Sequence, residues 1–367
     1  EELFAAHATA PEAARLPEET AEDERVAVAL VPDPDNAGYT LAYHSRAGAR
    51  QKHVSTMFSP AASLPDLKNM PQTTYVYDYK ELRHAAASFG IPLPDQVRDI
   101  MLGQYLLDPD QKAWSLERIG EACGMTEIDL TTAEEQADLI YHVSYAVDRA
   151  LEQEQLTRIL TEVEMPFASV LAAMEFTGIR TDTAYLRTLG AELGTRISEL
   201  ERKAYELVGT REYSLQSPKQ LGALLFDVLK LTPIKKTKTG PSTDVESLES
   251  LQNEHPVVPL ILELRQLTKI KGTYTDALIR FVGPDGRIHP TFLQTGTATG
   301  RISCINPNLQ NIPAKTEIGR EVRRAFIPSH EDWAFISADY SQIDLRMLAH
   351  LSADENLCQA FTKGEDI

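Results

Sequence analysis

The order of apolar and polar residues predicts an α/β segment first and a mostly helical segment after it. An apolar run at 26–31, turn residues at 32–38 and a second run at 39–44 predict a β-hairpin. Apolar residues then recur at helical spacing in three segments, at 79–89, 94–107 and 115–123. We therefore expect an α/β domain that ends near residue 150.

A long amphipathic helix is predicted to begin after Asp182, a residue type that caps helices well. Its apolar stripe consists of Leu186, Leu189, Leu193, Ile197, Leu200, Ala204 and Leu207. This spacing fits either a coiled coil or a helix packed on its own domain. The second interpretation is favoured, because the stripe is only about three heptads long.

Two capping boxes are predicted further along the chain. Ser217-Pro218-Lys219-Gln220 would open a helix at 220–229, and Thr243-Asp244-Val245-Glu246 would open the next one. A helix at 257–281, a turn at 283–286 and a strand at 288–294 should follow.

The chain's most informative feature is an apolar stretch, Trp333 to Ala338, that leads directly into Asp339. It reads as a buried strand that ends on a carboxylate and turns into a helix at Ile343-Asp344-Leu345-Arg346. Proteins present an acid to a metal ion in this way.

Charge is distributed unevenly over the 367 residues, whose formal net charge is −18. Residues 1–160 carry 13 Lys and Arg against 27 Asp and Glu, a net of −14, whereas residues 211–324 carry 16 against 11, a net of +5. Because nucleic acid requires a local basic surface, the middle of the chain could bind it despite the acidic total.

Other classes of protein are disfavoured. The three cysteines are widely spaced and the nine histidines form no H-x-x-x-H pair, so neither a disulfide framework nor a His/Cys metal site is predicted. No apolar run approaches the roughly 18 residues of a membrane span, and the N-terminus lacks an export signal. A cytoplasmic protein without membrane association is the expectation.

Three polar stretches allow either a functional or a purely structural reading. The loop at 235–242 could clamp phosphates or be a solvated connection, and the segments 297–301 and 306–313 could contact a minor groove or satisfy their own backbone. Three arginines at helical spacing could grip a triphosphate or a template, or could be ordinary surface residues; they are Arg320, Arg323 and Arg324.

Several of these motifs, in this order, resemble the family A DNA polymerases, the bacterial DNA polymerase I group. The resemblance is carried by TGTATGRIS, PNLQNIP, REVRRAFIPS and DYSQIDLR, and upstream by MEFTGIRTD, SPKQLGALLFDVL and KKTKTGPST. It covers about residues 160–367 and extends more weakly through the acidic N-terminal domain.

The resemblance implies a role for each matching residue. Asp339 and the backbone carbonyl of Tyr340 would bind Mg²⁺ in a two-metal site that this chain supplies only in part. Gln342 and Asp344 would lie near the incoming dNTP and its sugar. Primer-template DNA would be held by residues of the thumb tip and palm, namely Lys235, Lys236, Thr237, Lys238, Thr239, Ser242, Thr243, Thr297, Arg301, Asn308, Gln310 and Asn311. Further basic palm residues would be Arg320, Arg323, Arg324 and Arg346.

Three departures from the family pattern lead to further expectations. Asp344 stands where most relatives carry glutamate, which suggests relaxed exclusion of ribonucleotides unless a backbone adjustment restores it. The N-terminal domain resembles a 3′-5′ exonuclease, but residues 1–120 hold no D-x-E. Asp78 falls near one expected aspartate, whereas Thr74 and a tyrosine within 141–145 stand at other expected positions, so we expect no proofreading. The chain also stops before the family's fingers helix and second palm aspartate, so it should not polymerise alone.

The predicted fold is multidomain α/β (α+β): an RNase H-like exonuclease-type domain, a helical thumb and the first part of a polymerase palm. The expected boundaries are a leader at 1–24, the exonuclease-like domain at 25–155, the connection and thumb at 156–285 and the palm with motif A at 286–367. The predicted function is template-directed DNA synthesis in the bacterial cytosol or nucleoid, by a monomer or with a complementing polymerase segment. The alternative is a noncatalytic DNA-binding fragment.

Overall fold

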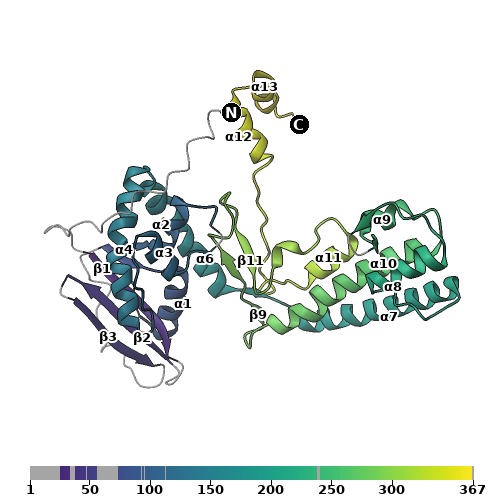
Figure 1. Ribbon diagram of the computed structural model, residues 1–367, viewed down its shortest axis with the longest axis horizontal. Coiled ribbons are helices and arrows are strands. Elements are labelled where there is room, and N and C mark those ends of the chain that lie inside the picture. Colours follow the sequence, from purple (N-terminus) through teal and green to yellow (C-terminus); the bar gives the residue numbers. More distant parts are fainter. Residues whose placement is uncertain are drawn as a thin grey trace. The chain divides into compact units, whose positions relative to one another are not determined.

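The computed structural model describes residues 25–33, 38–46, 48–55, 73–91, 93–94, 96–111, 113–237 and 240–365 (Figure 1). The chain divides into two compact units, Glu1–Phe326 and Ile327–Ile367, which are described separately. The predicted leader at 1–24 and the candidate residues Lys238 and Thr239 lie outside the described residues. Within the described ranges, no helix combines the length and apolar character needed to cross a membrane.

A five-stranded sheet opens the first unit, in the order β3-β2-β1-β4-β5. Its strands are β1 (Arg25–Asp33), β2 (Gly38–Ser45), β3 (Gly48–Ser55), β4 (Thr73–Val76) and β5 (Val97–Asp99). β1 and β2 form the predicted hairpin, with Ala29 opposite Ala42, and β4 and β5 continue the sheet in parallel from β1. The hairpin prediction is confirmed, and β3 is a further strand that the apolar pattern did not indicate.

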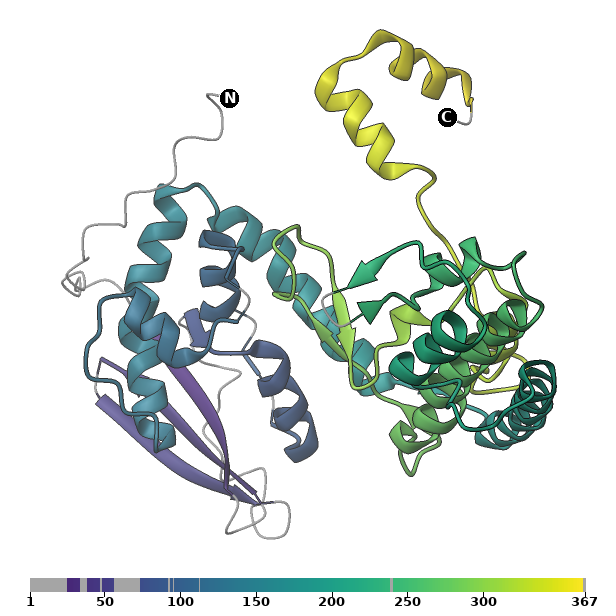
Figure 2. The same ribbon diagram turned by 45° about the vertical axis from the view of Figure 1, so that its right-hand side comes forward.

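Four helices belong to the same domain as this sheet: α1 (Tyr79–Phe89), α2 (Ile100–Leu107), α3 (Leu116–Ala122) and α4 (Ala133–Gln153). α4 packs on β1 and β2 (Figure 2). The predictions of α1 and α3 are confirmed. The helix predicted at 94–107 is wrong in its first part, because residues 97–99 pair with β4 and the helix begins only after Asp99 caps it.

A continuous helical segment leaves this domain as α5 (Thr157–Ile159), the π-helix η3 (Leu160–Glu164) and α6 (Met165–Thr177). Gly178 ends it with a positive φ of 61°, where a Cβ would meet the Ile288 carbonyl and the His289 ring. The chain then forms β6 (Ile179–Arg180), which pairs with β9 (Arg287–Ile288).

The helical layer that follows is built on α7 (Thr183–Val208), which packs along α10 (Val257–Ile270) (Figure 1). Leu186, Leu189, Leu193 and Leu200 of the predicted stripe are buried in one core with α10. The interpretation as a helix packed on its own domain is thus confirmed. The shorter elements are α8 (Pro218–Gly222), η4 (Ala223–Val228), α9 (Val245–Ser250), η5 (Lys271–Asp276) and η6 (Ile279–Phe281).

The predicted capping boxes differ from the observed caps. Ser217 is the N-cap of α8, but its side chain makes no capping bond. The Gln220 side-chain oxygen, which the capping box assigned to the Ser217 amide, accepts from the Ser214 amide at 2.6 Å. Asp244 caps α9 by accepting from the Ser247 amide at 2.9 Å. Ser217 was correctly predicted as an N-cap, although its reciprocal bond was wrong. The N-cap of α9 is Asp244, one residue after the Thr243 that the second box predicted.

The first unit ends with four short elements: β10 (Thr291–Leu293), β11 (Ser303–Ile305), η7 (Leu309–Asn311) and α11 (Glu317–Arg324). β10 and β11 are antiparallel, with Phe292 opposite Cys304. The predicted strand at 288–294 is therefore two short strands, β9 and β10, which belong to different sheets. The predicted turn at 283–286 is confirmed by the Gly286 amide, which donates to the Gly283 carbonyl at 3.0 Å.

The second unit contains two helices, α12 (Ile343–Ser352) and α13 (Glu355–Lys363). The strand predicted at 333–338 is wrong, since these residues form no strand and their apolar side chains are exposed, with Ile336 at 93%. Within residues 327–365 no other extended segment offers hydrogen bonds to such a strand. The fold as a whole is mixed α/β, as predicted.

Candidate functional site

Asp339 is exposed and lies in the segment without regular secondary structure that precedes α12. Tyr340 beside it is 80% exposed. Gln342 adopts the left-handed conformation, with a φ of 51°, and the helix begins at the next residue. The carboxylate at the helix entry was correctly predicted, although the element before it is not a strand.

The start of α12 is tied back to this turn by Arg346. Its Nε donates to the Ser341 carbonyl at 2.8 Å, and its guanidinium lies 4.6 Å from the centre of the Phe361 ring. Arg346 thereby links the turn, α12 and α13. Asp344 occupies the first turn of α12, where a negative charge is favourable to the helix dipole.

The polar segment at 297–301 forms the connection between β10 and β11. Thr297 Oγ1 donates to the Arg301 carbonyl at 2.8 Å, and the Tyr105 hydroxyl of α2 donates to the Thr297 carbonyl at 2.8 Å. The Arg301 side chain is exposed. Two backbone carbonyls of this segment are therefore hydrogen-bonded, while the Arg301 side chain is exposed to solvent.

The segment 306–313 is held by hydrogen bonds within itself and to residues outside it. The Gln310 amide donates to Asn308 Oδ1 at 3.0 Å, and Gln310 Nε2 donates to the Ile302 carbonyl at 2.9 Å. The Tyr274 hydroxyl donates to the Asn311 carbonyl. Asn308, Gln310 and Asn311 are nevertheless all exposed, so the stretch has both a structural and an outward-facing part.

The three arginines of α11 have different environments. Arg323 Nη2 donates to the Ile312 carbonyl at 3.1 Å, and so holds the preceding loop. Arg324 pairs with Glu321 at 3.0 Å, and Glu321 also accepts from the Tyr185 hydroxyl at 2.7 Å. Arg320 is exposed. The spacing of the three arginines predicted a common helical face. It did not predict that Arg323 bonds to the loop before the helix.

The predicted phosphate clamp is a small hairpin of β7 (Lys236–Thr237) and β8 (Gly240–Pro241). Lys235 Nζ lies 3.3 Å from Asp244 and 3.6 Å from Glu246, and its hydrogen bond to Asp244 raises the pKa of Lys235. Ser242 and Thr243 are buried, and the Thr243 carbonyl accepts from Arg265. Lys236 is the exposed cation of the described part of this hairpin.

Comparison with known proteins decides the family. The sequence profile described as "DNA polymerase family A" matches residues 183–367, which contain the β7–β8 hairpin, the β10–β11 connection, α11 and Asp339. The chain belongs to DNA polymerase family A. Relatives include DNA polymerase I of Geobacillus stearothermophilus, 42% identical over 80% of this chain and 36% of that protein, and the thermostable DNA polymerase I of Thermus aquaticus, 43% identical over 88% and 38%. The chain thus spans about a third of the length of these relatives.

A solved structure supports the same assignment. The polymerase domain of Pol1 from M. smegmatis, in complex with DNA primer-template and dNTP, is similar with a TM-score of 0.82 and 35% sequence identity. The similarity covers 94% of this chain and 62% of that chain, so it includes both the N-terminal domain and the family A motifs.

In the N-terminal domain, which precedes the region of the family A match, Asp78 and Asp99 have structural roles. Asp78 is the N-cap of α1 and accepts from the Glu81 amide at 3.2 Å. Asp99 is buried and accepts from the Tyr79 amide at 2.7 Å and the Met101 amide at 2.8 Å. Burial and the nearby charge of Asp78 raise the pKa of Asp99 to about 7.

Tyr141, in the stretch where the resemblance expects an aspartate, is fully buried and accepts a hydrogen bond from the Tyr145 hydroxyl at 3.1 Å. Among the described residues, a single group of three potential metal ligands has its donor atoms within 4.8 Å of one another: His44, Asp138 and His142. Asp78 is not part of it. The prediction that no His/Cys metal site exists overlooked this group, because His44 is distant in sequence and only the D-x-x-x-H spacing of Asp138 and His142 could have indicated it.

Proposed function

We propose that this chain is part of a template-directed DNA polymerase that adds deoxynucleotides to a primer 3′ end. The observation that carries the proposal is the family A match over residues 183–367, which includes the DYSQIDLR motif at 339–346. The M. smegmatis domain in complex with primer-template and dNTP supports DNA and nucleotide as partners. A DNA template would place the activity in the bacterial nucleoid.

Asp339 and the Tyr340 carbonyl would hold Mg²⁺ in this proposal. Both are oxygen donors, which Mg²⁺ prefers, and Asp339 is exposed at the entry to α12. Bound Mg²⁺ would lower the pKa of the primer hydroxyl and neutralise charge on the reacting phosphate. The turn held by Arg346 would keep the Asp339 carboxylate and the Tyr340 carbonyl in place.

Primer-template would be bound by exposed polar residues on three segments. Arg301, Asn308, Gln310 and Asn311 would reach minor-groove acceptors, which depend little on sequence, and Lys236 would follow the duplex backbone. Gln342 and Asp344 would face the nucleotide and its sugar. Arg323 would act indirectly, by holding the carbonyls of the loop that presents Asn311.

The proposed domains are an exonuclease-like domain at 25–155, the connection and thumb at 156–285, and palm from 286 onward. We propose that the first of these does not proofread. The capping role of Asp78 and the burial of Tyr141 support this, because two-metal hydrolysis requires several converging carboxylates. Removal of a mismatched 3′ nucleotide that disappears with Asp78→Asn would contradict it.

Primer extension by the full-length protein tests the polymerase proposal. Asp339→Asn should reduce extension by more than about 100-fold, since a metal ligand is lost. The matched control is Asp354→Asn, in the same unit, because asparagine also caps helices and α13 should be preserved. The chain of 367 residues alone should not extend a primer, because one carboxylate cannot hold two magnesium ions. Undiminished extension by the Asp339→Asn protein would overturn the proposal, and DNA binding without extension by the unaltered protein would favour a noncatalytic scaffold.

A further inference from the structure

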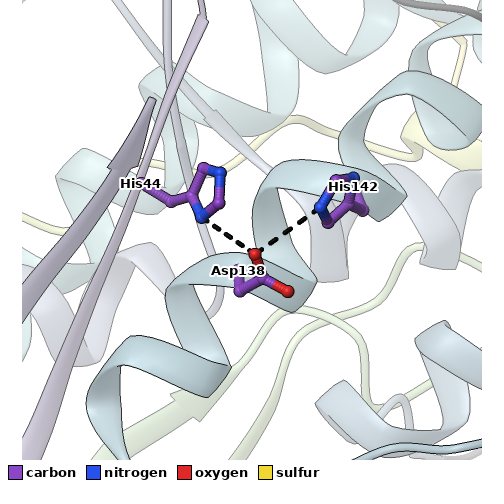
Figure 3. Close-up of side chains that lie close together, drawn as sticks. All are labelled: His44, Asp138 and His142. Atoms are coloured by element: carbon purple, nitrogen blue, oxygen red, sulfur yellow. Dashed lines mark ion pairs between the residues drawn. The ribbon is translucent and has the colours of Figure 1, made fainter. Parts of the chain in front are cut away.

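Three metal-ligating side chains converge between β2 and α4, in the part of the chain that precedes the family A match (Figure 3). His44 Nδ1 lies 2.9 Å from Asp138 Oδ1, and His142 Nε2 lies 3.5 Å from the same oxygen. All three donor atoms lie within 4.8 Å of one another. The two imidazoles therefore approach one carboxylate oxygen from two different elements.

The three residues are held in place by the two elements that carry them, α4 and β2. Asp138 and His142 are four residues apart on α4 and so share a helical face, while His44 is on β2, opposite Ala27 of β1. The His44 ring stacks on the buried Tyr141 with ring centres 4.5 Å apart. Tyr141 in turn accepts the hydrogen bond from Tyr145, so the orientation of His44 is supported by packed aromatic residues.

We propose that His44, Asp138 and His142 bind one divalent transition-metal ion, of the chemical class of Zn²⁺. Two imidazole nitrogens and one carboxylate oxygen are typical zinc ligands, whereas Mg²⁺ and Ca²⁺ prefer oxygen alone. At Zn²⁺–ligand distances of about 2.0–2.2 Å, neighbouring ligands of a tetrahedral site lie about 3.3 Å apart. The observed separations of 2.9 Å and 3.5 Å are close to this value.

The surroundings favour a cation. Asp138 also lines a pocket of about 360 Å³ whose other acidic residues are Glu127, Asp129, Glu134 and Glu135. Converging carboxylates raise the local concentration of cations. The Asp138 and His142 side chains are partly exposed, which leaves an approach for the ion and for a water molecule as fourth ligand.

A bound ion would join the sheet to its covering helix. It would bridge β2 and α4 at the point where the two imidazoles approach one carboxylate oxygen. Because the three ligands are brought together only in the folded domain, ion binding should stabilise that domain by mass action. This role is separate from nucleotide addition.

The test titrates the metal-free 367-residue chain with Zn²⁺ against a chromophoric chelator and repeats the titration with Co²⁺, monitoring the visible spectrum. We expect one Zn²⁺ per chain and no competition from excess Mg²⁺. His142→Gln and Asp138→Asn should each weaken Zn²⁺ binding by more than about tenfold, the lower bound for altering even an outer partner of a metal site. Zn²⁺ should raise the unfolding temperature of the unaltered chain but not that of the His142→Gln variant.

His289→Gln is the matched control. His289 Nε2 also contacts an aspartate four residues away, Asp285, at 3.0 Å, but it belongs to no three-ligand group among the described residues. This variant should bind Zn²⁺ like the unaltered chain, and circular dichroism would establish that each variant is folded. Absence of saturable Zn²⁺ binding, or equal affinity in the His142→Gln and unaltered chains, would overturn the proposal.

Discussion

The Lys80 ammonium lies 2.6 Å from the Glu175 carboxylate, in an ion pair whose side chains are only 13% and 7% exposed. The pair joins α1 of the N-terminal domain to α6. Glu175 also lies 2.6 Å from His84 Nε2 and accepts from the Phe292 amide of β10 at 2.7 Å. One buried carboxylate therefore connects three elements that are distant in sequence.

Replacing Glu175 should destabilise this junction strongly. Glu175→Gln leaves the Lys80 charge buried without a counter-charge, which typically costs about 3–5 kcal/mol. Urea unfolding at pH 7 measures the loss. The control is Glu162→Gln, because the Arg158–Glu162 pair is exposed and such pairs contribute little. Equal unfolding midpoints for the two variants would contradict the structural role of Glu175.

Lowering the pH should weaken these contacts of Glu175. Burial alone would raise the pKa of Glu175, but hydrogen bonds from His84, Lys80 and the Phe292 amide outweigh it, and the pKa is lowered. A carboxyl group with a lowered folded-state pKa contributes stability above its unfolded pKa and loses it as the pH falls through the folded value. The stability difference between the unaltered chain and the Glu175→Gln variant should therefore shrink below about pH 4, near the unfolded pKa of glutamate.

Asp99 should give the N-terminal domain the opposite pH dependence. Its folded-state pKa of about 7 lies above the unfolded value of about 3.9, so the folded state holds the proton more tightly between these values. Its contribution to stability is fully present below about pH 4 and is lost as the pH rises towards 7. Urea midpoints measured between pH 5 and 8 should show this fall.

Asp99→Asn should make that pH profile flatter. The variant should also be less stable throughout, because the asparagine side chain has one acceptor oxygen for the two amides that Asp99 binds. Asp182→Asn makes the same change at the N-cap of α7 and controls for an altered cap. An unchanged slope in the Asp99→Asn protein would refute the assignment.

Lys235 and Lys236, at the start of the β7–β8 hairpin, offer a direct test of the proposed DNA binding. Lys235 is held by Asp244 and Glu246, whereas Lys236 is exposed on β7. If Lys236 contacts a phosphate, Lys236→Gln should reduce the slope of log affinity against log salt by about 0.9. Fluorescence anisotropy with labelled primer-template in a salt series measures this slope. Lys235→Gln should change it less, and an identical effect of both substitutions would count against the proposed contact.

Sequence alone predicted the elements whose signals are local. The stripe of α7 and its cap Asp182, the Gly286 turn and the β1–β2 hairpin all depend on residues close together in the chain. The family motifs could also be identified from the sequence, since their order and spacing are properties of the sequence. Membership of DNA polymerase family A was therefore predictable from the residues of TGTATGRIS, PNLQNIP and DYSQIDLR without any knowledge of their spatial partners.

Features that depend on distant partners were missed. Residues 97–99 form a strand because β4 lies beside them, and residues 333–338 form none although they are apolar. The convergence of His44 on Asp138 requires the packing of β2 against α4, which no periodicity encodes. For the same reason, Arg323 was interpreted only as a surface or ligand residue, although it holds the Ile312 carbonyl.

The last prediction concerns Asp344, in the first turn of α12. The sequence resemblance to family A implies a glutamate at this position in most members of the family. We propose that the shorter acid rejects a ribonucleotide sugar less effectively. Asp344→Glu restores one methylene group and should raise selectivity for deoxynucleotides by about tenfold or more, the usual effect of a methylene in a recognition site. The measurement is the ratio of kcat/KM for dNTP and rNTP incorporation by the full-length protein. Asp354→Glu adds the same methylene at the N-cap of α13 and should leave the ratio unchanged. Equal selectivity of the Asp344→Glu and unaltered proteins would show that the backbone already compensates for the shorter side chain.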